Sequence, residues 1–318
     1  MLSLTEIEQA AEIVYGAMPP TPQYAWPLLA KRTGCEVWVK HENHTPIGAF
    51  KVRGGLVYMG RLKKAQPNVT GVISATRGNH GQSIALAAAR AGIAAVIVVP
   101  HGNSVEKNAA MRAFGAELIE AGHDFDAARE AALALAGERG LSMVPSFHRD
   151  LVCGVASYAL ELFRGSPPLD TVYVPIGLGS GICGVIAVRD ALGLSTKVVG
   201  VVSTEAPAYA LSFSAGKVVA TNSANTMADG MAVRGPDPQA LEIIQKGADR
   251  IVQVSDGEIA GAMRAYYEDA HQLTEGAGAG ALAALLQERA RMTGKRVGLI
   301  LSGGNIDRTL YLRTLAGD

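Results

Sequence analysis

Lys51 is the first side chain in this sequence whose surroundings suggest chemistry. It lies between Phe50 and Val52, in a run that continues Arg53-Gly54-Gly55. An apolar setting favours the neutral amine, which can act as a nucleophile or as a base. The same residues also fit an ordinary lysine that extends its ammonium group into water from a partly apolar helix start, and for an isolated lysine that interpretation is the more common one.

A small polar loop, Ser74 to Gln82, follows a short Val- and Ile-rich run. Its centre reads Thr76-Arg77-Gly78-Asn79-His80. Backbone amides at the start of a helix can bind a carboxylate, so the loop is a candidate substrate site. Asn79 could instead only cap the following helix, which is a common role for asparagine. The loop alone does not decide between these two functions.

A glycine-rich loop follows another apolar run, with the sequence Ile176-Gly177-Leu178-Gly179-Ser180-Gly181-Ile182-Cys183-Gly184. Exposed amides and the positive end of a helix dipole would hold a phosphate dianion there. The stretch Gly179–Gly184 also fits the GxGxxG pattern of dinucleotide-binding proteins. Glu205 lies 21 residues beyond Gly184, where a ribose-binding carboxylate is expected. Both ligands therefore stay open for this loop.

The last of these segments is Leu299-Ile300-Leu301 followed by Ser302-Gly303-Gly304-Asn305. It reads as a buried strand that ends in a small polar turn. The Ser302 hydroxyl could face a heterocycle nitrogen as a neutral hydrogen-bonding partner. A plain turn explains the same residues equally well.

The elements that must position these loops alternate between two kinds. Val- and Ile-rich runs with charges only at their ends suit strands buried on both faces, whereas the Ala- and Leu-rich stretches between them have helical spacing. This alternation predicts an α/β fold of parallel sheets flanked by helices, with ligands at the loops after the strands. The expected strands are Gly71–Ala75, Ala94–Pro100, Thr171–Ile176, Lys197–Ser203 and Arg296–Ser302, and expected helices include Gln82–Ala91, Asp124–Arg139, Leu151–Phe163, Glu258–Tyr267 and Ala277–Met292.

Composition narrows the class of partner. The chain has 318 residues, enough for two α/β domains of about 150 residues each. Its 29 basic and 29 acidic residues give no net field to attract nucleic acid or a membrane surface. The N-terminal stretch has several glutamates and no long apolar run, so a cytoplasmic protein that acts on a small molecule is expected. The three cysteines are far apart, which suggests neither disulfides nor a zinc site.

Taken together, the four segments resemble the serine/threonine dehydratase group of fold-type-II pyridoxal-phosphate enzymes, which also includes serine racemase. The resemblance spans nearly the whole chain in the family's order and includes Thr21-Pro22, Thr226-Met227-Ala228-Asp229-Gly230 and Glu275-Gly276-Ala277-Gly278-Ala279. It implies a two-domain fold like that of the tryptophan synthase β subunit, with the cofactor between the domains, and a homodimer. The large domain would comprise residues 1–70 and 148–318, the inserted mobile domain residues 71–147, and no C-terminal regulatory domain is expected.

The resemblance also implies a reaction and a set of roles. Lys51 would hold pyridoxal 5′-phosphate as a Schiff base and then remove the α-proton of a 3-hydroxy amino acid, which yields a 2-oxo acid and ammonia. Asn79 would bind the cofactor's phenolic oxygen, the glycine loop its phosphate, and Ser302 its ring nitrogen. The implied cofactor contacts are Phe50, Lys51, Asn79, Gly177, Leu178, Gly179, Ser180, Gly181, Glu275 and Ser302. The implied substrate contacts are Thr76, Arg77, Gly78, His80, His148 and Ser157.

Three departures from the family pattern bear on the substrate. Ala49 replaces the usual serine before the Phe-Lys pair. Arg77 occupies the place where serine racemase carries the serine that protonates the opposite face, which argues against racemisation. Arg77 could pair with the second carboxylate of 3-hydroxyaspartate, lie over the ring of phenylserine, or point to solvent. The segment Gly154-Val155-Ala156-Ser157 replaces the usual Gly-Gln-Gly-Thr, so the pocket is expected to be more apolar and the substrate other than threonine.

No divalent cation is expected. Some family members bind one through a carboxylate, but Val202 falls at that position and Glu205 comes three residues late. Other functions remain open: a racemase or β-replacement enzyme of the same fold, a dinucleotide-binding oxidoreductase, or a non-catalytic ligand-binding protein. Analysis of reaction products would separate them.

Overall fold

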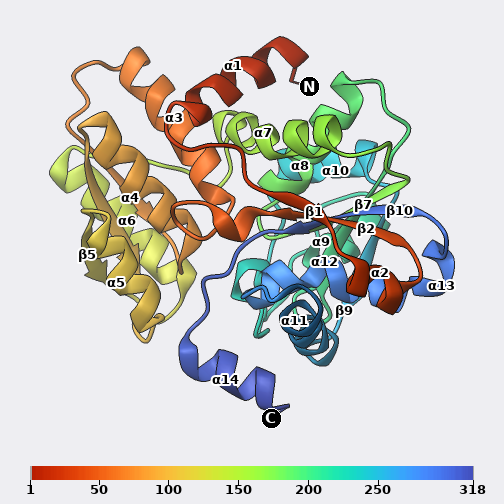
Figure 1. The fold of residues 1–318 in the computed structure, drawn as a ribbon. Coiled ribbons are helices and arrows are strands. Elements are labelled where there is room, and N and C mark those ends of the chain that lie inside the picture. Colours follow the sequence, from red (N-terminus) through yellow and green to blue (C-terminus); the bar gives the residue numbers. More distant parts are fainter. Residues whose placement is uncertain (1, 318) are drawn as a thin grey trace.

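Two separate β-sheets organise the chain, and helices flank both (Figure 1). The computed structural model describes residues 2–317. The strands are β1 (Gln23–Ala25), β2 (Glu36–His41), β3 (Gly71–Ala75), β4 (Ala94–Val99), β5 (Glu117–Glu120), β6 (Ser142–Met143), β7 (Thr171–Pro175), β8 (Lys197–Ser203), β9 (Arg250–Val254) and β10 (Arg296–Leu301). The helices are α1 (Leu4–Tyr15), α2 (Pro27–Thr33), α3 (Lys51–Ala65), α4 (Asn79–Ala91), α5 (Val105–Ala113), α6 (Phe125–Arg139), α7 (Arg149–Gly165), α8 (Ser180–Ala191), α9 (Ala208–Ala215), α10 (Pro238–Gly247), α11 (Asp256–Ala270), α12 (Gly276–Gln287), α13 (Arg289–Met292) and α14 (Arg308–Ala316), with short 3-10 turns η1 (Glu42–His44) and η2 (Asp229–Met231).

The larger sheet has six strands in the order β1-β2-β10-β7-β8-β9. All its pairs are parallel except β1 with β2, so the predicted α/β class with parallel sheets is confirmed. The central strands β7, β8 and β10 are buried along nearly their whole length. This burial explains their continuous apolar runs, because α12 packs on this sheet and α8 packs against β7 and β8.

The smaller sheet has four parallel strands in the order β5-β4-β3-β6, all of them between residues 71 and 143. Helices α4 and α6 pack against β3 and β4, and in Figure 1 this sheet and its helices lie on the left of the molecule. The division into a large and an inserted mobile domain stays a prediction, and its outer limits, Met1 and Asp318, lie outside the described residues. None of the helices within residues 2–317 is both long and apolar enough to cross a membrane.

Helix α3 connects the two sheet assemblies, because it packs on α4 of one and on α7 of the other. The predicted strands match the observed ones to within one residue at each end. One predicted helix, Ala277–Met292, is in fact two, α12 and α13, with Glu288 between them. The Glu288 carboxylate accepts hydrogen bonds from Arg250 Nε at 2.8 Å and Tyr173 Oη at 2.5 Å, so tertiary contacts hold the chain at this break.

A buried ionic cluster lies behind the first turn of α3. This Arg53 cluster consists of Arg53, Lys40, Glu42 and Glu161, whose side chains are at most 7% exposed. Arg53 donates to Glu42 at 2.7 Å and to Glu161 at 2.6 Å, and Lys40 lies 2.6 Å from Glu161. Ser157 is hydrogen-bonded to this cluster, since its hydroxyl accepts from Arg53 at 2.9 Å and donates to the Gly154 carbonyl at 2.8 Å.

Candidate active site

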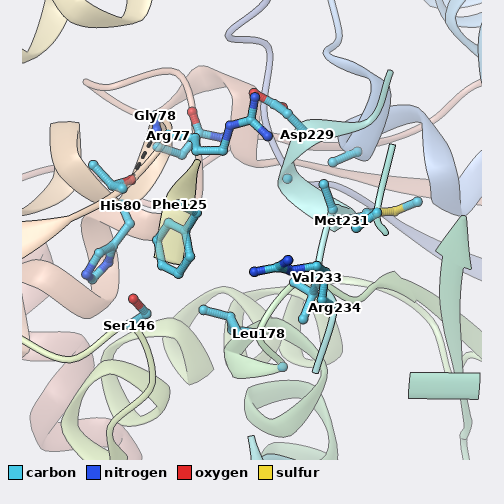
Figure 2. A pocket seen from close by; sticks show the side chains of 18 of the residues that line it. Arg77, Gly78, His80, Phe125, Ser146, Leu178, Asp229, Met231, Val233 and Arg234 are labelled. Carbon is cyan, nitrogen blue, oxygen red and sulfur yellow. Dashed lines mark hydrogen bonds between the residues drawn. The ribbon is translucent and has the colours of Figure 1, made fainter. Parts of the chain in front are cut away.

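A cavity of about 790 Å³ is lined by residues from both sheet assemblies. Its walls come from the loops that follow β3, β7 and β10, from α5 and the start of α6, and from the segment 220–235. Figure 2 shows this cavity at close range. The loops after parallel strands are the usual ligand-binding places of such folds, and three of the loops singled out by the sequence meet here.

Lys51 is the first residue of α3 and lines the cavity. Its Nζ lies 3.2 Å from the Ser180 hydroxyl and 5.0 Å from the centroid of the Phe50 ring. Burial lowers the pKa of the Lys51 amine to about 8. At neutral pH this shift raises the neutral fraction of the amine by about two orders of magnitude, so Lys51 is suited to both nucleophilic attack and proton transfer.

The glycine loop, Gly177 to Gly181, lines the cavity along its full length. Helix α8 begins at Ser180, and its N-cap, Gly179, supplies no side chain to the first amides. Gly179 has φ +99°, and a Cβ there would lie 2.7 Å from that of Ala240, so glycine is required for both reasons. The Leu178 carbonyl is held by the Tyr209 hydroxyl at 3.0 Å. The result is a fixed helix start that can accept a phosphate.

Asn79 is part of a chain of side chains that crosses the cavity wall. Its Nδ2 donates to Glu275 Oε1 at 2.8 Å, and its Oδ1 accepts from Asn305 Nδ2 at 2.8 Å. The alternative that Asn79 merely caps its helix is wrong, because the N-cap of α4 is Gly78. Glu275 is 2% exposed, and burial raises the pKa of its carboxyl to about 7. Its second oxygen, Oε2, is buried without a partner in the described part of the chain.

Ser302 lies directly after β10, is 4% exposed and lines the cavity. The loop that carries it is joined to the start of α3: the Phe50 amide donates to the Ser302 carbonyl at 3.0 Å, and Ala49 forms an isolated antiparallel bridge with Gly303. The structure therefore brings the Lys51 and Ser302 segments together although they are far apart in the sequence.

Arg77 lies at the mouth of the cavity and is exposed. Within residues 2–317 it forms no ion pair, whereas Arg234, across the same mouth, pairs with Asp126 and lies 3.9 Å from Asp124. The loop below Arg77 is fixed by the Gly78 amide, which donates to the Thr76 hydroxyl at 3.1 Å (Figure 2). The lining also includes the apolar side chains of Phe125, Leu178, Met231 and Val233.

His80 lines the cavity, and two other predicted substrate contacts do not. The His80 Nε2 is buried without a partner among the described residues, and burial, with a contribution from Lys51, lowers its pKa to about 3, so the ring is neutral. His148 instead caps α7 by accepting from the Asp150 amide at 3.1 Å, and its ring packs on Tyr58. The Ser157 hydroxyl is hydrogen-bonded to Arg53 of the Arg53 cluster instead. Sequence proximity was the misleading signal for His148, whereas for Ser157 it was the match of the segment Gly154–Ser157 to a family motif.

Two residues of the cavity were given no role on sequence grounds. Lys107, in the first turns of α5, donates a hydrogen bond to Asp229. Asp229 lies in the segment Thr226–Gly230, which was named only as part of the family resemblance, and Lys107 lies in no recognised motif. The sequence signal that could have drawn attention to Lys107 is its place near the start of a helix, where acidic side chains are favoured and a lysine is unusual.

Comparison with known proteins assigns the family. The profile described as "Pyridoxal-phosphate dependent enzyme" matches residues 14–303, and the chain belongs to this family. It is 34% identical to the L-threonine ammonia-lyase of Thermotoga maritima over 99% of this chain and 78% of that protein. It is 32% identical to the L-threo-3-hydroxyaspartate ammonia-lyase of a Pseudomonas species over 99% of both chains. The solved structure of maize serine racemase superposes with a TM-score of 0.92 at 27% identity, over 99% of this chain and 97% of the other.

The chain is therefore a pyridoxal-phosphate-dependent, β-eliminating ammonia-lyase of the serine/threonine dehydratase group. This membership removes the dinucleotide-binding oxidoreductase as an alternative. In the described part of the chain, no three histidine, cysteine, aspartate or glutamate side chains are grouped as metal ligands. Glu205 lies exposed after β8.

Proposed function

We propose that the enzyme eliminates water from a 3-hydroxy amino acid that carries a second carboxylate, of the 3-hydroxyaspartate type, and releases a 2-oxo acid and ammonia. The observation that supports this substrate is Arg77, a cation that lines the cavity and is not paired with any described carboxylate. A guanidinium matches a carboxylate with two parallel hydrogen bonds. A full-length relative named for L-threo-3-hydroxyaspartate is consistent with the proposal.

The residues present fit pyridoxal phosphate. The cavity combines an amine of lowered pKa, a helix start without a side-chain cap and a buried carboxyl with a partnerless oxygen. The cofactor's electron-poor ring supplies the stabilisation of negative charge at the substrate's α-carbon. We infer that Lys51 would hold it covalently, that the amides of the glycine loop would bind the phosphate, and that Asn79 and Ser302 would orient the ring.

Lys51 has a second task in this proposal. As a free amine, whose pKa burial lowers to about 8, the Nζ would take the α-proton of the substrate. The Ser180 hydroxyl, 3.2 Å away, would hold the Nζ in place between these events. The neutral His80 adds no positive charge that would oppose formation of the ammonium group at Lys51.

The role of Lys51 is tested with the Lys51→Ala variant. We expect the wild-type protein to be labelled at Lys51 after borohydride reduction and the variant to lack both the label and turnover. In wild-type apoprotein the rate of covalent cofactor capture should rise with pH about a midpoint near 8, the pKa of the Lys51 amine, because only the neutral amine reacts. A midpoint near 10 would contradict the lowered pKa.

The substrate is tested by measuring 2-oxo acid release from serine, threonine, 3-hydroxyaspartate and phenylserine isomers. We expect Arg77→Ala to lower kcat/KM for hydroxyaspartate by about 10- to 100-fold, the value of a charged hydrogen bond, and to change the value for serine little. Arg313→Ala, on the distant helix α14, is the matched control. Equal losses for all substrates would contradict a carboxylate contact at Arg77.

Phenylserine is the second candidate, because the cavity lining also includes the apolar side chains of Phe125, Leu178, Met231 and Val233 (Figure 2). An aryl group would bury apolar surface there at about 25 cal/mol per Å². Turnover of phenylserine that exceeds that of hydroxyaspartate and falls in Phe125→Ala would support this substrate in place of the first.

A further inference from the structure

Four polar side chains in the cavity wall connect the two sheet assemblies. This Lys107 cluster consists of Lys107 from α5, Asp229 from η2, Glu275 at the N-cap of α12 and Asn79 at the start of α4. Lys107 donates to Asp229, and Asn79 donates to Glu275 at 2.8 Å. Lys107 and Asn79 come from the side of the smaller sheet, whereas both acids come from the side of the larger one.

Close packing fixes the members of the cluster. A Cβ on Gly78, the residue before Asn79, would lie 2.7 Å from Lys107 Cδ, so the lysine stem lies directly against this loop. A Cβ on Gly303 would lie 2.7 Å from Glu275 Oε1, so the glutamate lies against the loop of Ser302. Lys107 and Glu275 thus contact the two loops that would orient the cofactor ring.

The charges of the cluster do not balance. Lys107 is one cation beside two acids, and Glu275 Oε2 has no partner among the described residues. Burial raises the pKa of Glu275, Asp229 raises it further, and Lys107 and the Asn79 hydrogen bond lower it. Lys107 itself stays charged, because Glu275, Asp229 and Asp307 together outweigh its burial and raise its pKa. Among the described residues, Lys107 and Asp229 are the charged groups that act on Glu275.

We propose that Lys107 is a positioning residue that, together with its partner Asp229, acts on Glu275 and through it on Asn79. Burial raises the pKa of Glu275 to about 7, so its proton would be exchanged next to the cofactor ring near neutral pH. The inference rests on the role proposed above for Asn79. The inference goes beyond that role, since the strength of the hydrogen bond between Asn79 and Glu275 would depend on Lys107. When Glu275 is ionised, it holds the Asn79 amide strongly; when it is protonated, that hold weakens.

The test is a pH titration of the visible absorbance of the bound cofactor, with no substrate present. We expect a transition near pH 7 in the wild type that is absent in Glu275→Gln. Lys107→Met keeps a stem of similar length against Gly78 and removes the charge, so the midpoint should rise by about one unit or more. Asp229→Asn removes a negative charge and should move the midpoint in the opposite direction.

Opposite shifts from the two variants would establish the electrostatic coupling, because a general loosening of the cavity cannot change sign. Lys246→Met, an exposed lysine on α10 that pairs with Glu242, is the control and should leave the midpoint unchanged. A midpoint that is the same in Lys107→Met and wild type, or no transition in the wild type, would overturn the inference. Because no amino acid is present, a wrong substrate assignment leaves this titration unaffected and is detected only in the 2-oxo acid assay.

Discussion

The Arg53 cluster and the Lys107 cluster each place a buried glutamate near basic side chains, yet the two glutamates behave in opposite ways. Burial acts to raise the pKa of Glu161, but Arg53 and Lys40 outweigh it and hold that pKa below its ordinary value. Burial raises the pKa of Glu275 to about 7, and one lysine does not compensate for it. The two positions are similarly inaccessible, so the difference comes from their partners.

Every carboxylate oxygen of Glu42 and Glu161 accepts at least one hydrogen bond, and the two acids of that cluster face two bases. Glu275 leaves one oxygen without a partner and shares a single base with Asp229. A fully paired cluster rigidifies the fold, whereas an incompletely paired one in a cavity can respond to a ligand or a proton. The comparison distinguishes the Arg53 cluster, which stabilises the fold, from the Lys107 cluster, which lies in the cavity wall and can respond to a proton or a ligand.

The largest expected effect comes from breaking the balanced cluster. Arg53→Met leaves Glu42 and Glu161 buried with Lys40 as their remaining cation, so unfolding in denaturant should show a loss of about 3–5 kcal/mol. Arg164→Met, which breaks the exposed pair with Glu8, should cost less than about 1 kcal/mol. If Arg53→Met also lost less than about 1 kcal/mol, the complete pairing of the Arg53 cluster would not be what stabilises the fold.

A smaller effect on stability is expected at Glu275, where the substitution should remove a destabilisation instead of causing one. Below the ordinary pKa of a carboxyl group, Glu275 is protonated in both the folded and the unfolded chain. Between that value and about 7 the unfolded chain loses the proton first, so stability falls as pH rises, by about 1.4 kcal/mol per unit of pKa difference. Glu275→Gln should reduce this decline, which thermal unfolding between pH 5 and 8 would measure. An unchanged pH profile would place the raised pKa in doubt.

The smallest effect is expected at the cavity mouth. Arg234 and Asp126 form an ion pair, but both side chains are more than 40% exposed. Arg234→Ala should therefore change the free energy of unfolding by less than about 1 kcal/mol and lose even this in high salt. A larger, salt-resistant change would show that exposed pairs in this molecule behave like the buried clusters.

The sequence predicted the parts of the fold and site that depend on local pattern. The strand runs at Gly71–Ala75 and Lys197–Ser203 match β3 and β8 residue for residue, because strands buried on both faces need continuous apolar runs. The segments around Lys51, Asn79, the glycine loop and Ser302 all line the cavity, since each begins a helix or follows a strand of one of the two sheets.

The contacts that depend on chain folding in three dimensions could not be predicted in this way. Nothing local distinguishes Lys107, which reaches Asp229 across 122 positions of sequence, from a surface lysine. Ser157 was placed in the pocket because the segment Gly154–Ser157 stands where the family has Gly-Gln-Gly-Thr, but the register of α7 turns it toward Arg53. The break between α12 and α13 likewise reflects Arg250 and Tyr173, which lie in other strands.

The central strand pairing of the larger sheet also bears on how the molecule forms during synthesis. Strand β10 lies between β2 and β7, and its Arg296 pairs with Glu36, 260 residues earlier. Closing so long a loop costs chain entropy before the contact forms, so the pairing of β10 with β2 is slow. The four-stranded sheet, in contrast, contains only neighbouring segments and has all its strands once residue 143 has left the ribosome. Until β10 has been synthesised, the facing edges of β2 and β7 have no pairing strand, and the addition of β10 both closes the sheet and brings Ser302 to Lys51.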